Sequence, residues 1–180
     1  MTTDTSSVSS QPSMFAKLRE RLARRPDSEH IQAAIRIGIG LILTVYVTIT
    51  AQENGVITAM GWRVLPVAAL FDLLAIGLFI GIVIRPQVSI IRRILGIVAD
   101  IGMNTYVLLM LGEDGAPLYG VYLWVAFGNG FRYGPQYLYL AASLSVAGFM
   151  FVFLSNEYWA AHRALGVGLI VALIVLPLYV

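Results

Sequence analysis

The chain has 180 residues, of which 58% are hydrophobic and only 12% are charged, and its formal net charge is +2. Soluble domains carry about one quarter charged residues, so this composition excludes an ordinary soluble domain and indicates an integral membrane protein. The chain contains no cysteine, which excludes disulfides, thiol catalysis and thiolate metal sites.

The first 26 residues differ in character from the rest of the chain. Residues 1–12 are rich in Ser and Thr and predict a disordered polar tail. Residues 13–26 predict an amphipathic basic helix, which either senses an anionic membrane surface or is a plain anchor beside it. Its apolar residues at helical spacing are Phe15, Leu18 and Leu22, and its basic residues are Lys17, Arg19, Arg21, Arg24 and Arg25.

Six apolar segments follow, and we expect residues 27–180 to form an all-α polytopic bundle with six membrane spans. The segments are residues 31–51, 64–84, 94–111, 118–130, 137–154 and 165–180. The fourth is short, because about 13 helical residues cover only ~20 Å of a ~30 Å hydrocarbon core. We expect its helix to break at Gly128, Asn129 and Gly130. If it does not continue through Arg132 it is re-entrant, which leaves five spans as the alternative.

Basic residues are distributed unevenly between the two ends of the six expected spans. One end holds only Arg63 and Arg163. The other end holds Lys17, Arg19, Arg21, Arg24, Arg25, Arg85, Arg92, Arg93 and Arg132. By the positive-inside rule, both termini of a multi-pass protein of the bacterial inner membrane are therefore expected in the cytoplasm.

Four polar side chains fall inside the expected spans and form a candidate intramembrane network. Arg36 lies ~9 Å along its helix from His30, and Asp100 lies ~10 Å along its helix from Arg93, on the same side of the membrane. Their similar depth allows an ion pair, which is either a structural lock between two helices or part of a functional site. Asp72 shares its depth with no basic residue, so we expect it to be protonated or to bond a hydroxyl or an amide such as that of Asn104.

A candidate binding site lies at the cytoplasmic end of the fourth segment. Arg36 and Arg132 both come close to that end, and a guanidinium fork binds a carboxylate well. Asn129, Tyr133 and Tyr137 are close to Arg132 in the sequence. A wall of aromatic residues is expected above them: Tyr119, Tyr122, Trp124 and Phe127. This pattern suits an amphiphile with an acidic head and a hydrocarbon tail, and the alternative is an ordinary packing and interface belt.

No catalytic constellation is visible in the sequence. His30 and His162 are far apart and fall on opposite faces, and no nucleophile, phosphate-binding or kinase motif is present. We therefore expect no catalytic residues, no metal site and no cofactor in this segment, and no nucleic-acid partner.

Four ordered motifs resemble those of one family. They are D-S-E-H-I-Q-A-A-I-R-I at 27–37, I-R-P-Q-V-S-I-I-R-R-I-L-G at 84–96, P-L-Y-G-V-Y-L-W-V-A-F-G-N-G-F-R-Y-G at 117–134 and L-P-L-Y at 176–179. Together they resemble the transmembrane sensor domain of RpfC-type hybrid histidine kinases, which sense the diffusible signal factor. The resemblance covers the chain from Asp27 to its C-terminus and leaves out the polar tail.

The resemblance implies the input domain of a bacterial two-component quorum-sensing receptor whose signal is a cis-2-unsaturated fatty acid. It places Asp27, Ser28 and Glu29 in the signal-sensing segment. Family members continue into a dimerisation helix pair, an ATP-binding domain, a receiver and a phosphotransfer domain. A homodimer, ATP and autophosphorylation are therefore expected of the full-length receptor. The family is commonly drawn with five spans and the acidic segment outside, whereas the arginine distribution places that segment inside.

Our expected ligand-binding set comprises Asp27, Ser28, Glu29, Arg36, Asn129, Arg132 and Tyr133, and our expected polar network comprises Arg36, Asp72, Asp100 and Asn104. The expected partners are a fatty-acid signal and the lipid bilayer. One alternative is a small transporter or channel, which needs a polar path across the whole membrane. Another is a structural dimerisation module that uses the small-residue patterns Gly77-x-x-x-Gly81 and Gly130-x-x-x-Gly134.

Overall fold

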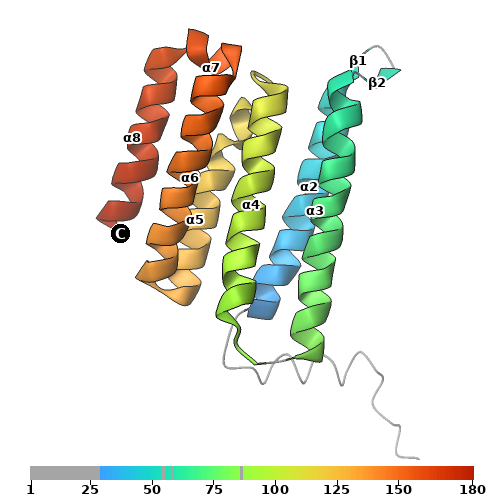
Figure 1. The fold of residues 1–180 in the computed structure, drawn as a ribbon, viewed down its shortest axis with the longest axis vertical. Coiled ribbons are helices and arrows are strands. Elements are labelled where there is room, and N and C mark those ends of the chain that lie inside the picture. The colour runs from blue at the N-terminus through green and yellow to red at the C-terminus, as the bar shows by residue number, and fades with distance from the viewer. Residues whose placement is uncertain (1–28, 54–55, 58, 86) are drawn as a thin grey trace, which may run out of the picture.

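The computed structural model describes residues 29–53, 56–57, 59–85 and 87–180. The expected polar tail, the expected basic helix, Asp27 and Ser28 lie outside the described residues. The described part is an up-and-down helical bundle whose long helices run side by side (Figure 1).

The elements follow the chain in a simple order. They are α2 (Glu29–Ala51), β1 (Gln52–Glu53), β2 (Val56–Ile57), α3 (Ala59–Ile84), α4 (Ile90–Leu111), the 3-10 helix η1 (Ala116–Tyr119), α5 (Gly120–Tyr133), α6 (Pro135–Ser155), α7 (Glu157–Ala161) and α8 (Arg163–Tyr179). The two short strands pair antiparallel in the connection between α2 and α3, with Gln52 opposite Ile57. All six expected apolar segments are helical, so the expected all-α bundle is confirmed.

Four of the described helices are long and apolar enough to cross a membrane. They are Glu29–Ala51, Gly61–Ile84, Ile90–Leu111 and Pro135–Ser155. The chain is therefore a membrane protein. Because α5 has 14 residues and α8 has 17, the count of six spans stays a prediction.

The expected break at Gly128, Asn129 and Gly130 is wrong, because α5 runs through these residues to Tyr133. A Cβ on Gly130 would lie 2.8 Å from the Cβ of Leu138 on α6, so this glycine permits close contact between the two helices. The chain turns instead at Gly134, whose φ of 97° favours glycine. Since η1 leads directly into α5, the continuous helical backbone is about 29 Å long.

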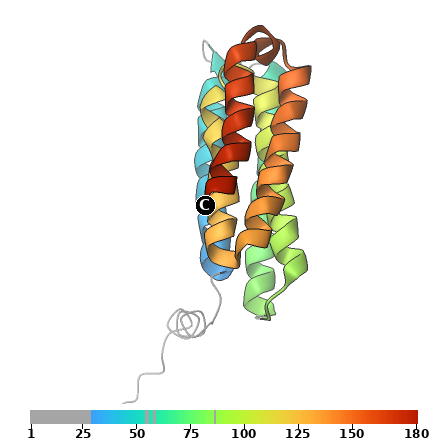
Figure 2. The same ribbon diagram turned by 90° about the vertical axis from the view of Figure 1, so that its left-hand side faces the viewer.

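The bundle has two parts. In the first, α2 and α3 pack against each other as a hairpin, and a Cβ on Gly40 would overlap Asp72 Oδ1 across their interface. In the second, α4 to α8 enclose an aromatic core in which Phe149 packs edge-on against Tyr122 and Trp159, and all three side chains are fully buried. The second part lies to one side of the hairpin (Figures 1 and 2).

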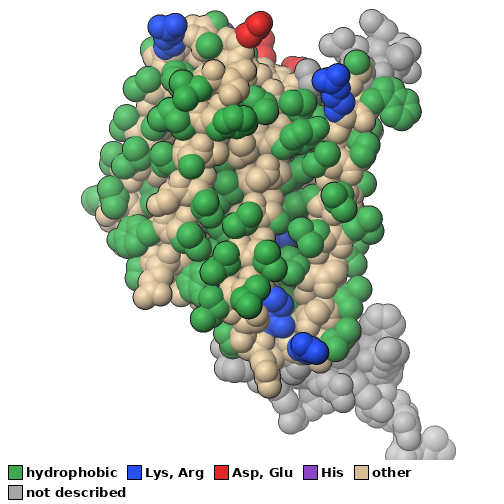
Figure 3. Space-filling model, in the orientation of Figure 1, with side chains coloured by type: hydrophobic (Ala, Val, Ile, Leu, Met, Phe, Trp, Pro, Cys, Tyr) green, Lys and Arg blue, Asp and Glu red, His purple; other side chains and the backbone are tan. Residues whose placement is uncertain are grey.

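Charged residues concentrate at the two ends of the described bundle. Glu113 and Asp114, in the turn after α4, lie at one end of the bundle. The starts of α3 and α8, which carry Arg63 and Arg163, lie at the same end. Arg85, Arg92 and Arg93 lie at the opposite end, between α3 and α4. Figure 3 shows the charged side chains at these ends and a mostly hydrophobic surface between them. This surface matches a bundle surrounded by lipid.

Candidate functional site

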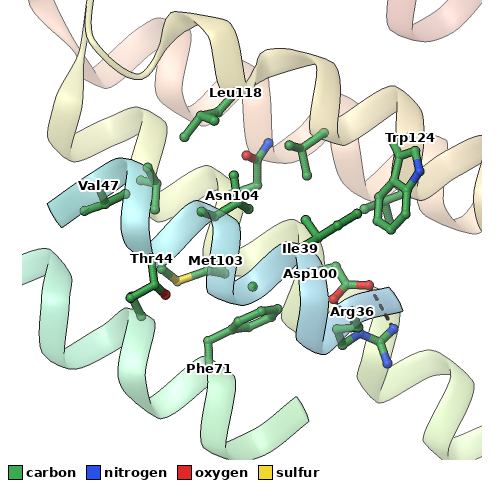
Figure 4. A pocket seen from close by; sticks show the side chains of 16 residues that line it. Arg36, Ile39, Thr44, Val47, Phe71, Asp100, Met103, Asn104, Leu118 and Trp124 are labelled. Atoms are coloured by element: carbon green, nitrogen blue, oxygen red, sulfur yellow. Dashed lines mark hydrogen bonds and ion pairs between the residues drawn. The ribbon is translucent and has the colours of Figure 1, made fainter. Parts of the chain in front are cut away.

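A cleft separates the α2–α3 hairpin from α4 and α5 (Figure 4). Its walls bound about 540 Å³ of space, which includes the open mouth, and the closed cavity within it measures about 30 Å³. The lining side chains are apolar except for Arg36, Thr44, Asp100 and Asn104, and Trp124 adds one indole N–H. Phe71 and Met103 line the cleft and also line an open groove of about 610 Å³ between α3 and α4. An apolar chamber with few polar groups is typical of a site for a hydrophobic ligand.

Arg36 and Asp100 form the ion pair expected from their similar depth. Arg36 Nε donates to Asp100 Oδ1 at 2.6 Å, and Nη2 donates to Oδ2 at 2.8 Å. Both side chains are about 10% exposed. The pair joins α2 to α4 at one end of the cleft, and in this structure it neutralises both charges.

Gly96 on α4 provides the space that the Arg36 guanidinium occupies. A Cβ at this position would lie 2.8 Å from Arg36 Cζ and from Nη1. Any side chain here must therefore displace the guanidinium or move α4 away from α2.

Gly96→Ala is expected to destabilise the protein by about 2 kcal/mol, because overpacking a closely packed site costs ~1–3 kcal/mol. Gly102→Ala on the same helix is the matched control, because no atom lies within 4 Å of its added Cβ. That change is expected to be neutral or stabilising. Thermal unfolding of both variants in detergent checks this, and equal melting temperatures would show that Arg36 has free space.

Asp72 bonds a hydroxyl, which is one of its expected partners, and it does not bond the amide of Asn104. Thr44 Oγ1 donates to Asp72 Oδ2 at 2.9 Å within the α2–α3 hairpin. Among the described residues, neither amide atom of Asn104 has a hydrogen-bond partner, and Asn104 is 3% exposed. Asp72 therefore bonds a hydroxyl, whereas Asn104 faces the cleft.

Glu29 binds two arginines at the end of the bundle where α2 and α4 begin. Its Oε2 accepts from Arg92 Nη2 at 2.9 Å, and its Oε1 accepts from Arg93 Nε at 2.7 Å. The Glu29 side chain is 3% exposed, and the guanidinium of Arg93 lies 4.1 Å from the centroid of the Tyr133 ring. Glu29 and Tyr133 thus lie together as expected, but they contact arginines of the protein. We call Glu29, Arg92, Arg93 and Tyr133 the Glu29 cluster.

The Glu29 cluster was not predicted from the sequence. The same depth argument that paired Arg36 with Asp100 applies to Glu29 and Arg93, because both begin helices at the same end. Arg92 and Arg93 were assigned only to the expected cytoplasmic excess of basic residues, so their pairing with Glu29 was not predicted.

Asn129 is buried and connects α5 to α2. Gln32 Nε2 donates to Asn129 Oδ1 at 2.6 Å, and Asn129 Nδ2 donates to the carbonyl of Val125 at 2.7 Å. Both side chains are less than 10% exposed. Asn129 therefore positions α2 against α5, and its amide is already occupied.

Arg132 has no hydrogen bond or ion pair with the part of the chain that the structure describes. It is half-buried and lines a smaller pocket together with Gln32, Arg36, Asp100 and Trp124. This pocket and the cleft share Arg36, Asp100, Trp124 and Val125. The side chain of Arg132 therefore supplies an uncompensated positive charge next to the apolar cleft.

The expected single aromatic wall is wrong. Trp124 lines the cleft (Figure 4), but Tyr119 and Tyr122 pack edge-on against Phe149 in the core on the other side of α5. Phe127 stacks on Phe131. Residues on a helix rotate by about 100° per position, so aromatic residues that are adjacent in the sequence point to different neighbours.

No group of three or more His, Asp or Glu in the described ranges could hold a metal ion. The polar side chains of the site are instead arginines, carboxylates and amides. Such groups bind anions and hydrogen-bonding ligands.

Comparisons with known proteins identify two relatives of the same kind. No family model and no solved structure matches the chain. The sensory/regulatory proteins RpfC of two strains of Xanthomonas campestris pv. campestris are each 38% identical to it over 162 residues, which is 90% of this chain. The chain spans only 22% of the length of these relatives. The resemblance seen in the sequence motifs is thus confirmed, and the chain is related over most of its length to one segment of the RpfC sensory/regulatory proteins.

Proposed function

We propose that this chain is the membrane input domain of a two-component quorum-sensing receptor and that it binds a fatty-acid signal in the cleft. The observation that carries this proposal is the continuity of an apolar cleft with an unpaired cation, Arg132. We infer that the signal belongs to the cis-2-unsaturated fatty acids, as the resemblance to the RpfC-type family implies. The relation to the RpfC sensory/regulatory proteins supports a sensing role.

The carboxylate of the signal binds Arg132 in this proposal. Arg36 is a weaker candidate, because Asp100 already occupies its guanidinium in a two-bond contact. Glu29 carries the wrong charge to hold a carboxylate and already accepts from two arginines. Arg132 keeps a free fork of N–H donors, which matches the geometry of a carboxylate.

The hydrocarbon tail extends along α5 into the apolar part of the cleft. Leu118 on η1 and Val121 and Val125 on α5 line the cleft between its two ends. Leu118 and Arg132 are 14 positions apart, which corresponds to about 21 Å along the helical backbone. The cleft therefore provides a long apolar path that begins beside a cation.

Signal passage uses the opposite face of α5. Tyr119, the last residue of η1 directly before α5, donates a hydrogen bond to the carbonyl of Leu169 on α8. A ligand that favours one position of α5 thereby favours one position of α8, which is a population shift between two arrangements. In the proposed full-length receptor, a homodimer in the bacterial inner membrane with both termini of this domain in the cytoplasm, α8 passes this change to a kinase that binds ATP.

Arg132→Gln is expected to weaken binding of a cis-2-unsaturated fatty acid about tenfold, because it removes a charge-assisted hydrogen bond. The measurement is binding to the purified protein in lipid nanodiscs, with a series of acids that differ in chain length. The methyl ester of the same acid is expected to bind the native protein and the variant equally, because it has no anionic head.

Arg163→Gln is the control, because Arg163 is exposed and lies at the opposite end of the bundle. This change is expected to leave binding unaltered. Equal affinity of the native protein and Arg132→Gln for the free acid would show that the head group binds elsewhere. Failure of the native protein to bind any acid of the series would refute the proposed function.

A further inference from the structure

Asn104 is a polar side chain in an apolar chamber. It is 3% exposed, it lines the cleft, and neither its Nδ2 nor its Oδ1 has a partner among the described residues. Figure 4 shows its amide beside Leu118, away from the Arg36–Asp100 pair. A buried amide without partners costs free energy, and within a bilayer no bulk water is present to offset the cost. An occupant of the cleft that bonds this amide would remove that cost.

A single water molecule is a poor candidate for this occupant. A buried water needs two to four polar partners. Besides Asn104, the polar lining residues are Arg36 and Asp100, which bond each other, and Thr44, whose hydroxyl donates to Asp72. Of the other lining side chains, only Trp124 has a polar atom, and Figure 4 shows its indole nitrogen pointing away from the Asn104 amide. A water beside Asn104 would therefore lack enough partners.

The position of Asn104 determines which part of a ligand it can reach. It lies four residues beyond Asp100 on α4, which is ~6 Å further along the helix. Arg132 lies near the other side of the Arg36–Asp100 pair, because the pocket that it lines includes both of those residues. A fatty acid whose carboxylate binds Arg132 therefore brings part of its chain, and not its head group, to Asn104.

We propose that Asn104 is a specificity-determining residue that hydrogen-bonds a second polar group, carried partway along the hydrocarbon chain of the ligand. An amide offers both a donor and an acceptor, and a hydroxyl group also offers both. The preferred ligand is accordingly a fatty acid with a chain hydroxyl, and a chain carbonyl would satisfy only the Nδ2 donor. This inference rests on the proposed function, since it assumes a fatty acid in the cleft.

The test compares an unsubstituted medium-chain cis-2-unsaturated acid with isomers that carry one hydroxyl at successive chain positions. Binding is measured to the purified chain in lipid nanodiscs. One isomer is expected to bind the native protein about threefold to tenfold more tightly than the parent acid, which corresponds to one net hydrogen bond. Asn104→Leu is expected to abolish this preference and to bind the parent acid at least as well, because it removes an unpaired amide from an apolar site.

Ser145→Ala is the matched control. Ser145 is also fully buried with a hydroxyl that has no partner within the described residues, but it does not line the cleft. This variant is expected to retain the preference for the hydroxylated isomer. If the native protein binds every isomer no better than the parent acid, or if Asn104→Leu keeps the preference, the role of Asn104 is refuted while fatty-acid binding stands. If no acid binds the native protein, the proposed function fails and this inference fails with it.

Discussion

Asp100→Ala is expected to lower the free energy of unfolding by about 3–5 kcal/mol, because it leaves the buried guanidinium of Arg36 without its anion. Arg36 has no second carboxylate within ion-pair distance in the described part of the chain. For a chain of this size, the loss corresponds to a melting temperature lower by roughly 6–20 °C. Thermal unfolding in detergent, followed by the fluorescence of Trp124 and Trp159, measures the change.

The double variant with Arg36→Met and Asp100→Leu is the decisive comparison. Replacing both members of a buried ion pair by apolar residues of similar size is often neutral or stabilising. We therefore expect the double variant to recover most of the stability that the single variant loses. A double variant as unstable as Asp100→Ala would contradict this view, because it would show that the loss comes from packing and not from an uncompensated charge.

Glu29→Gln is expected to destabilise the protein by about 3 kcal/mol and to separate the ends of the α2–α3 hairpin and α5. The estimate is at the low end for breaking a buried ion pair, because the side chains of Arg92 and Arg93 are 17% and 14% exposed and keep some solvation. The glutamine retains the shape of Glu29 but removes the charge that attracts both arginines.

Spin labels can measure this separation, because the chain has no native cysteine. Cysteines at Ile84 and Phe131, which are 71% and 74% exposed, place one label at the end of α3 and the other near the end of α5. We expect a longer and broader distance distribution in Glu29→Gln. The control Glu157→Gln changes an exposed carboxylate at the opposite end and is expected to have no effect. An unchanged distribution in Glu29→Gln would mean that the Glu29 cluster does not hold the two parts together.

Depth along the membrane could be predicted from the sequence, because the rise per residue of a helix is fixed. This constant placed Arg36 and Asp100 at the same level, and the structure joins them by two hydrogen bonds. The helices themselves were predicted from their apolar length for the same reason. Neither the depth of a residue nor the length of an apolar helix depends on which helices are neighbours.

The direction in which a residue faces could not be predicted, because it depends on which helices pack together. Tyr122 and Trp124 are two positions apart, yet one lies in the core and the other lines the cleft. Whether a glycine breaks a helix or allows a neighbouring helix to approach could not be predicted either. Gly130 was interpreted as a break, but it lies within a continuous helix and allows Leu138 to approach. Contacts between distant segments, such as Gln32 with Asn129, decide these cases.

Phe71 and Met103 line both the cleft and the open groove between α3 and α4, so these two side chains lie between the cleft and a groove that faces the surrounding acyl chains. An acyl chain dissolved in the bilayer is already surrounded by hydrocarbon. A tail that moves from the bilayer into the cleft therefore gains almost nothing from leaving water. Membrane phospholipids are present in large excess over the signal, and their acyl chains are equally hydrophobic. They therefore compete with the signal for the cleft. Under those conditions, recognition depends on shape and on a few polar contacts, and greater hydrophobicity confers no advantage.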